Sequence, residues 1–197
     1  MCRFLRKFFP KILPCFCHKK NRVAVDKHIL PDEECVRCVL HPYHIHSNQK
    51  LRQEAFVPRH NDNRVSLLRI RYSSIDFAHS HGRRIAERGK NCRYVGLVSI
   101  TRQIVEEVNS WAKSKESGVK DGYESNGIEA DIVYAPMIND EEYASVEETI
   151  YLDDPNVQLP MHADLTFSEK CDKEVQTRMR QYARELVKRV QNSFISS

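Results

Sequence analysis

The chain is poor in glycine and has no long apolar run. Six glycines in 197 residues exclude a glycine-rich repeat or linker protein. No apolar stretch approaches the ~20 residues that a helix needs to cross a bilayer. The signatures of several enzyme classes are missing as well, because the sequence contains no GxSxG, no GxxxxGK[ST], no GxGxxG and no HExxH. No motif therefore fixes a reaction.

Positive charge is concentrated at the amino-terminal end. Residues 1–22 hold seven cations and no acid, so the formal net charge of +4 leaves −3 for the rest of the chain. The hydrophobic content of 41% is ordinary for a protein with a buried core. We therefore expect a basic tail over 1–22, a linker over 23–34 and a single domain over 35–197. The charge of this body does not indicate nucleic-acid binding.

Cysteine usage points to a reducing compartment. The seven cysteines are an odd number and are scattered along the chain. Pro10 and Pro14 interrupt the first apolar stretch, and no small-residue cleavage site follows it. We therefore expect free thiols and a cytoplasmic location, with a peripheral position at the inner face of the membrane as the alternative.

Hydrophobic periodicity predicts an α+β fold, with a small mixed sheet, helices packed on it and a long carboxy-terminal helix. Strands are expected at 35–40, 64–71, 92–100, 128–135 and 161–167. Strands and helices interleave without regular βαβ spacing, which favours this class over a doubly wound fold.

Three helices are predicted. The first runs from Ser74 to Arg88 and ends at Gly89, and the second begins after a cap at Ser99 or Thr101. The third is the carboxy-terminal helix, which carries one apolar stripe that we expect to pack on the sheet. This stripe consists of Val175, Met179, Tyr182, Leu186, Val190 and Phe194.

Cys35-x-x-Cys38 has the spacing of half a zinc site, and Cys15 and Cys17 offer a second pair. The setting argues against this interpretation, because residues 35 and 38 of a strand point to opposite faces. Buried thiols that pack as small apolar side chains are the alternative, which we prefer. We therefore predict no cofactor and no stoichiometric structural zinc, with zinc left open as the less favoured hypothesis.

Histidines and arginines give the candidate catalytic and ligand-binding residues. His44 and His46 share one face if they lie on a strand, and His162 is a third candidate for proton transfer. Arg37 and Arg69 are candidates for binding an anionic ligand, since guanidinium groups recognise phosphate with two donors. The opposing interpretation is a polar loop after a strand, with arginines that are solvated or paired with acids.

Four short blocks carry a resemblance: HPYHI at 41–45, LRQEAFVP at 51–58, RVSLLRI at 64–70 and LPMHADL at 159–165. They are similar to the His-Pro-x-His, Ala-Phe-x-Pro, Val-Ser and Pro-x-His-Ala blocks of a group of small uncharacterised bacterial proteins. No activity accompanies this resemblance. It implies a bacterial source, a compact domain and one shared site for His44 and His162.

The basic tail is amphipathic if residues 3–16 form a helix. Phe4, Phe8, Phe9 and Ile12 then lie on one half and the cations on the other. Such a helix would contact an anionic membrane surface or a protein partner, although Pro10 would kink it. Docking on the protein's own domain is the alternative.

Two functions stay open on the sequence. The first is a binding or accessory module without catalysis, in a larger bacterial assembly such as an immunity system. The second is an enzyme that acts on a phosphate- or nucleotide-containing substrate through His44, His46, His162 and nearby arginines. Convergence of the histidines in one pocket would favour the enzyme, and their dispersal would favour the module.

Overall fold

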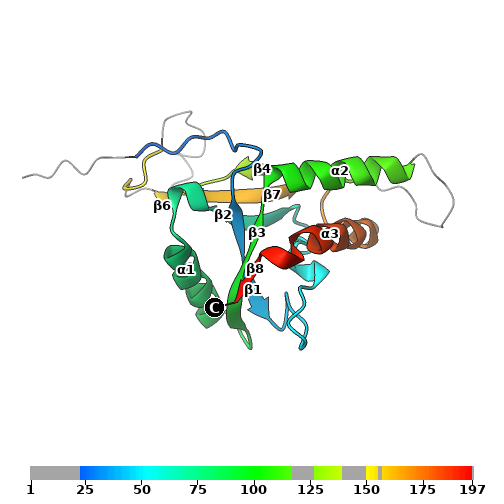
Figure 1. The fold of residues 1–197 in the computed structure, drawn as a ribbon, viewed down its shortest axis with the longest axis horizontal. Helices are drawn as coiled ribbons and strands as arrows, with labels where there is room; N and C mark the ends of the chain where they lie inside the picture. Colours follow the sequence, from blue (N-terminus) through cyan, green and yellow to red (C-terminus); the bar gives the residue numbers. More distant parts are fainter. Residues whose placement is uncertain (1–22, 117–126, 139–149, 155–156, 197) are drawn as a thin grey trace, which may run out of the picture.

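The computed structural model describes residues 23–116, 127–138, 150–154 and 157–196. These residues form three layers, in which a sheet lies between one helix on one face and two helices on the other (Figure 1). The helices are α1 (Ile75–Arg88), α2 (Arg102–Glu116) and α3 (Gln176–Val190), with single turns at Gln53–Ala55, Ile70–Tyr72 and Gln191–Ser193. The strands are β1 (Cys35–His41), β2 (Arg64–Arg69), β3 (Arg93–Ile100), β4 (Ala130–Tyr134), β5 (Met137–Ile138), β6 (Val157–Leu159), β7 (His162–Phe167) and β8 (Phe194–Ser196).

The main sheet has six strands in the order β4-β7-β2-β1-β3-β8, and β5 and β6 form a separate pair. The predicted α+β class is confirmed. The prediction of a mixed sheet is wrong, because every described pair of neighbouring strands is antiparallel. The helix α1 connects β2 to β3, and β1 lies between these two strands in the sheet. The two strands therefore do not pair with each other, and no parallel pair forms at this connection.

The larger core lies between the sheet and the helices α2 and α3. The predicted stripe of α3 is buried from Met179 to Val190, and Leu186 is fully inaccessible. Its last member departs from the prediction: α3 ends at Val190, and Phe194 begins the edge strand β8 instead. Gly96, with φ +153°, allows β8 to pair with β3, because a Cβ there would collide with the carbonyl of Ile195.

The smaller core lies between the sheet and α1. The helix α1 begins one residue after its predicted start, because Ser74 is its cap: the Ser74 hydroxyl accepts the Phe77 N–H at 3.0 Å, and Gly89 follows the last turn as predicted. Gly82 allows close packing of α1 on β3, because a Cβ there would overlap the ring of Tyr94. The helix α1 packs mainly on β1 and β3, so it does not cover the other strands on this face of the sheet to the same extent.

Residues 23–34 are not a linker, contrary to the sequence-based prediction. Val25 and Ile29 are buried, and Ala24 forms a bridge with Tyr151. Glu33 is buried as well and pairs with Arg69 of β2. Because these groups are desolvated against the domain, this segment is part of the fold. The predicted tail over 1–22 lies outside the described residues. Within the described part of the chain, no helix combines the length and apolarity needed to cross a bilayer.

Candidate functional site

A cleft opens where β1 separates from β2. The two strands pair through Cys35 and Val36. Beyond this point the 52–59 segment and the carboxy-terminal end of α1 supply residues that line the cleft. The cleft has a volume of about 910 Å³, within the range of pockets that hold organic ligands. We refer to it as the cationic cleft. Its lining comprises Arg37, Cys38, Leu40, Pro42, Tyr43, His44, Arg52, Glu54, Val57, Pro58, Arg59, Ser66, Ile85, Arg88, Gly89, Lys90 and Cys92.

Arg37 is held in place at the point where the strands separate. Its Nε donates to the carbonyl of Ala55 at 3.2 Å, and its Nη1 donates to the carbonyl of Ser66 at 3.0 Å. Burial lowers the pKa of this guanidinium below its usual range, but an arginine stays protonated at neutral pH. Among the described residues, no carboxylate lies within ion-pair distance of Arg37. The cleft therefore contains a fixed, poorly solvated positive charge.

Three further cations line the cleft without a counter-ion among the described residues: Arg59, Arg88 and Lys90. Within the part of the chain that the structure describes, Glu54 supplies the only carboxylate that lines the cleft, and it already pairs with Arg52 at 3.3 Å. The chain therefore carries a local excess of positive charge here, although its net charge beyond residue 22 is −3. Like charges held together in a concave site favour an anionic ligand.

His44 lines the cleft as a neutral side chain. Burial, and to a smaller extent the charge of Arg37, lowers the pKa of His44 to about 3, against a weaker opposing effect of the Cys38 carbonyl. Its Nδ1 lies 3.2 Å from the Leu40 N–H and accepts from it, so the ring proton is assigned to Nε2. A general base at neutral pH needs a pKa near 7. This arrangement therefore makes His44 a hydrogen-bonding group rather than a base.

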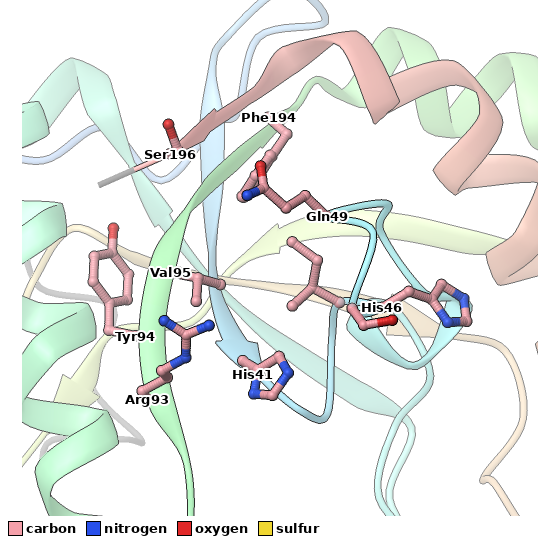
Figure 2. Close-up of a pocket in the computed structure, with 10 residues that line it drawn as sticks. His41, His46, Gln49, Arg93, Tyr94, Val95, Phe194 and Ser196 are labelled. Atoms are coloured by element: carbon pink, nitrogen blue, oxygen red, sulfur yellow. The ribbon is translucent and has the colours of Figure 1, made fainter.

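His46 belongs to a different, smaller pocket of about 240 Å³. Figure 2 shows that His41 and Arg93 lie close together in it, while the imidazole of His46 points away from both. This pocket lies between the loop after β1 and the strands β3 and β8. His44 and His46 therefore do not face one ligand, contrary to the prediction from their spacing.

His162 lies apart from both the cationic cleft and the pocket of His46. It begins β7, is 6% exposed and lines neither pocket. Its Nδ1 lies 2.5 Å from the carbonyl of Ala135, and its Nε2 lies 3.8 Å from Oδ1 of Asp164. Burial raises the pKa of Asp164, against the opposing charges of His162 and nearby arginines. His44 lines the cationic cleft and His162 does not, so the two histidines do not share this site, contrary to the expectation.

Arg69 is not available to a ligand, contrary to the sequence-based prediction. Its side chain is inaccessible, and its Nε and Nη2 donate to the two carboxylate oxygens of Glu33 at 2.5 and 2.9 Å. Further donor groups bind the carbonyls of Asp26 and His28. This arginine therefore attaches the 23–34 segment to β2. The sequence around Arg69 resembles that around Arg37, because both arginines lie in strand-like runs of branched residues.

The cysteine pair is arranged as predicted. Cys35 lies in the larger core and Cys38 in the smaller one, on opposite faces of the sheet. Burial raises the pKa of Cys35 to about 12 and that of Cys38 to about 11, whereas a zinc ligand must be a thiolate. The described residues contain no cluster of three or more His, Cys, Asp or Glu side chains that could hold a metal ion. Cys15 and Cys17 lie outside the described residues.

Most residues of the cationic cleft were not identified from the sequence. Arg52 and Arg59 come from one segment and Arg88 and Lys90 from another, so no local motif joins the four. Comparison of the chain with known proteins finds no family model, no curated protein and no solved structure that matches it. The resemblance to small bacterial proteins therefore stays a prediction, and the chemistry of the site has to be argued from its own residues.

Proposed function

We propose that this protein is a binding module that holds a phosphate-bearing ligand in the cationic cleft. The observation that carries the proposal is the group of four cations, Arg37, Arg59, Arg88 and Lys90, that have no carboxylate partner among the described residues. Arg37 is half-buried, and a charge that is partly removed from water without a counter-ion is costly, whereas the other three cations are exposed and add to the positive field of the cleft. A phosphate group would offset this cost, because its oxygens match the planar fork of arginine donors.

The enzyme alternative, which acts on a phosphate- or nucleotide-containing substrate, has less support. It needs histidines that converge on one ligand, and His44, His46 and His162 line different places. The histidine that does line the cleft has a pKa of about 3, so it does not exchange a proton readily near neutral pH. Dispersed histidines and an unpaired cationic cleft both favour binding over catalysis.

Calorimetric titration of the full chain with inorganic pyrophosphate tests the proposal. We expect saturable binding that weakens as salt is added. Arg59→Gln combined with Arg88→Gln should weaken it at least tenfold, since both residues are exposed at the cleft and are not needed for packing. Arg180→Gln is the matched control, because Arg180 is an exposed arginine on α3 that does not line the cleft. Equal affinity of all variants, or no binding at all, would overturn the proposal.

The wider role proposed from the sequence, an accessory component of a larger bacterial assembly, is compatible with a ligand-binding module. Size-exclusion chromatography of the tagged protein from its own cells tests it. Co-elution with a defined partner at constant stoichiometry is the expected result, and elution of the chain alone at every ligand concentration would contradict it.

A further inference from the structure

The cationic cleft also contains an aromatic ring that its charged residues do not explain. Tyr43 follows β1, lines the cleft and is 50% exposed. Its hydroxyl donates to the carbonyl of Lys90 at 3.3 Å, which joins the turn after β1 to the loop between α1 and β3. Among the described residues, no aromatic ring and no guanidinium stacks on Tyr43. The cleft therefore offers a tethered, uncovered ring.

Apolar side chains continue from this ring along the cleft. Ile85 is 37% exposed on α1, and Pro42, Val57 and Leu40 line the same cavity. The cleft has a volume of about 910 Å³, and an inorganic phosphate would occupy only the part of it that the cations line. The apolar side chains would then stay exposed to water. A ligand with a flat, apolar body joined to its phosphates would cover both kinds of surface.

We infer that the ligand of the cationic cleft is a mononucleotide whose base stacks on Tyr43 while its phosphates contact Arg37, Arg59 and Arg88. This inference rests on the proposed function and adds the class of ligand. Base stacking on an aromatic side chain beside arginines is the usual way in which proteins bind exposed bases. A mononucleotide fits better than a polymer, because the positive charge is local and the chain beyond residue 22 has a net charge of −3.

Calorimetry of the full chain with ADP, GDP, CDP and UDP, compared with inorganic pyrophosphate, tests the inference. The nucleotide that binds tightest should exceed pyrophosphate in affinity by about tenfold, the contribution of one stacked base. Tyr43→Ala should remove this advantage, and its affinity for pyrophosphate should equal that of Tyr43→Phe, which lacks the same hydroxyl. Tyr43→Phe is the matched control: it keeps the ring and loses only the hydroxyl tether to Lys90, so it should retain most of the advantage.

The outcomes separate the two proposals. If pyrophosphate binds as tightly as every nucleotide, or Tyr43→Ala binds them as well as the parent does, the ligand class is wrong and the anion site stands. If neither pyrophosphate nor any nucleotide binds, the proposed function fails together with the inference. Tighter binding of a single-stranded deoxythymidine oligonucleotide than of the best mononucleotide would overturn the inference in favour of a polymer.

Discussion

The ion pair between Glu33 and Arg69 gives the sharpest prediction about stability. The side chain of Glu33 is 3% exposed and that of Arg69 is 0% exposed. Glu33→Gln keeps the size of the side chain and one acceptor oxygen but removes the negative charge, so the buried Arg69 guanidinium is left with neutral partners, among them the carbonyls of Asp26 and His28 and the rings of Tyr72 and Tyr134. Breaking a buried pair in this way costs about 3–5 kcal/mol of the free energy of unfolding.

For a domain of this size such a loss corresponds to a fall in Tm of about 6–20 °C. Calorimetry or thermal unfolding followed by circular dichroism measures it. Glu34→Gln is the matched control, because Glu34 is the next residue and is exposed, so its change should stay within about 0.5 kcal/mol. Replacing both partners, Glu33→Leu with Arg69→Met, should recover much of the loss, because no charge is left unpaired. Equal Tm values for the Glu33 and Glu34 variants would refute the reasoning.

Three further predictions follow from the core, from His44 and from the tail. Leu186→Asp should unfold the domain, because it places a charge in the larger core, while Thr177→Asp on the exposed side of α3 should not; unchanged melting of the Leu186 variant would show that the α3 stripe does not pack on the sheet. The folded state holds the pKa of His44 near 3, below its usual 6.5, so the stability that it contributes is present above about pH 6.5 and is lost as the pH falls toward 3. His44→Gln should therefore lose less stability than the parent between these pH values, and parallel pH curves would contradict this. Full-length protein should sediment with anionic liposomes in a salt-sensitive way, and removal of residues 1–22 should abolish this while leaving a folded domain. Phe8→Asp should weaken the sedimentation, and equal recovery of full-length and truncated protein would end the membrane hypothesis.

The local elements could be predicted because their signals are local. Ser74 and Gly89 mark the ends of α1, and Thr101 marks the start of α2, where its hydroxyl lies 3.4 Å from the Ile104 N–H. The stripe that includes Met179 and Leu186 repeats with the period of a helix. Each of these signals depends on residues within one or two turns of one another, so periodicity and capping chemistry were sufficient.

Strand order and the roles of the arginines could not be predicted, because they depend on distant residues. Arg37 and Arg69 occur in similar surroundings along the chain. One reaches an open cleft, while the other meets Glu33 across 36 positions of sequence. The segment 23–34 is polar and contains a proline, and its burial depends on distant partners such as Arg69 of β2 and Tyr151. His44 and His46 were expected to share a face because they were placed on a strand, but β1 ends at His41.

The central claim, that the cationic cleft binds phosphate, is tested most directly by observing Arg37 itself. The Nε–H of Arg37 donates to the Ala55 carbonyl, so its resonance should be protected from exchange and visible in ¹⁵N–¹H spectra, and Arg37→Lys assigns it. Titration with inorganic pyrophosphate should shift this resonance with the same saturation curve as calorimetry, while the Nε–H of Arg180 on α3 stays in place. A shift at Arg180 alone, or an unmoved Arg37 resonance at saturating pyrophosphate, would contradict the account.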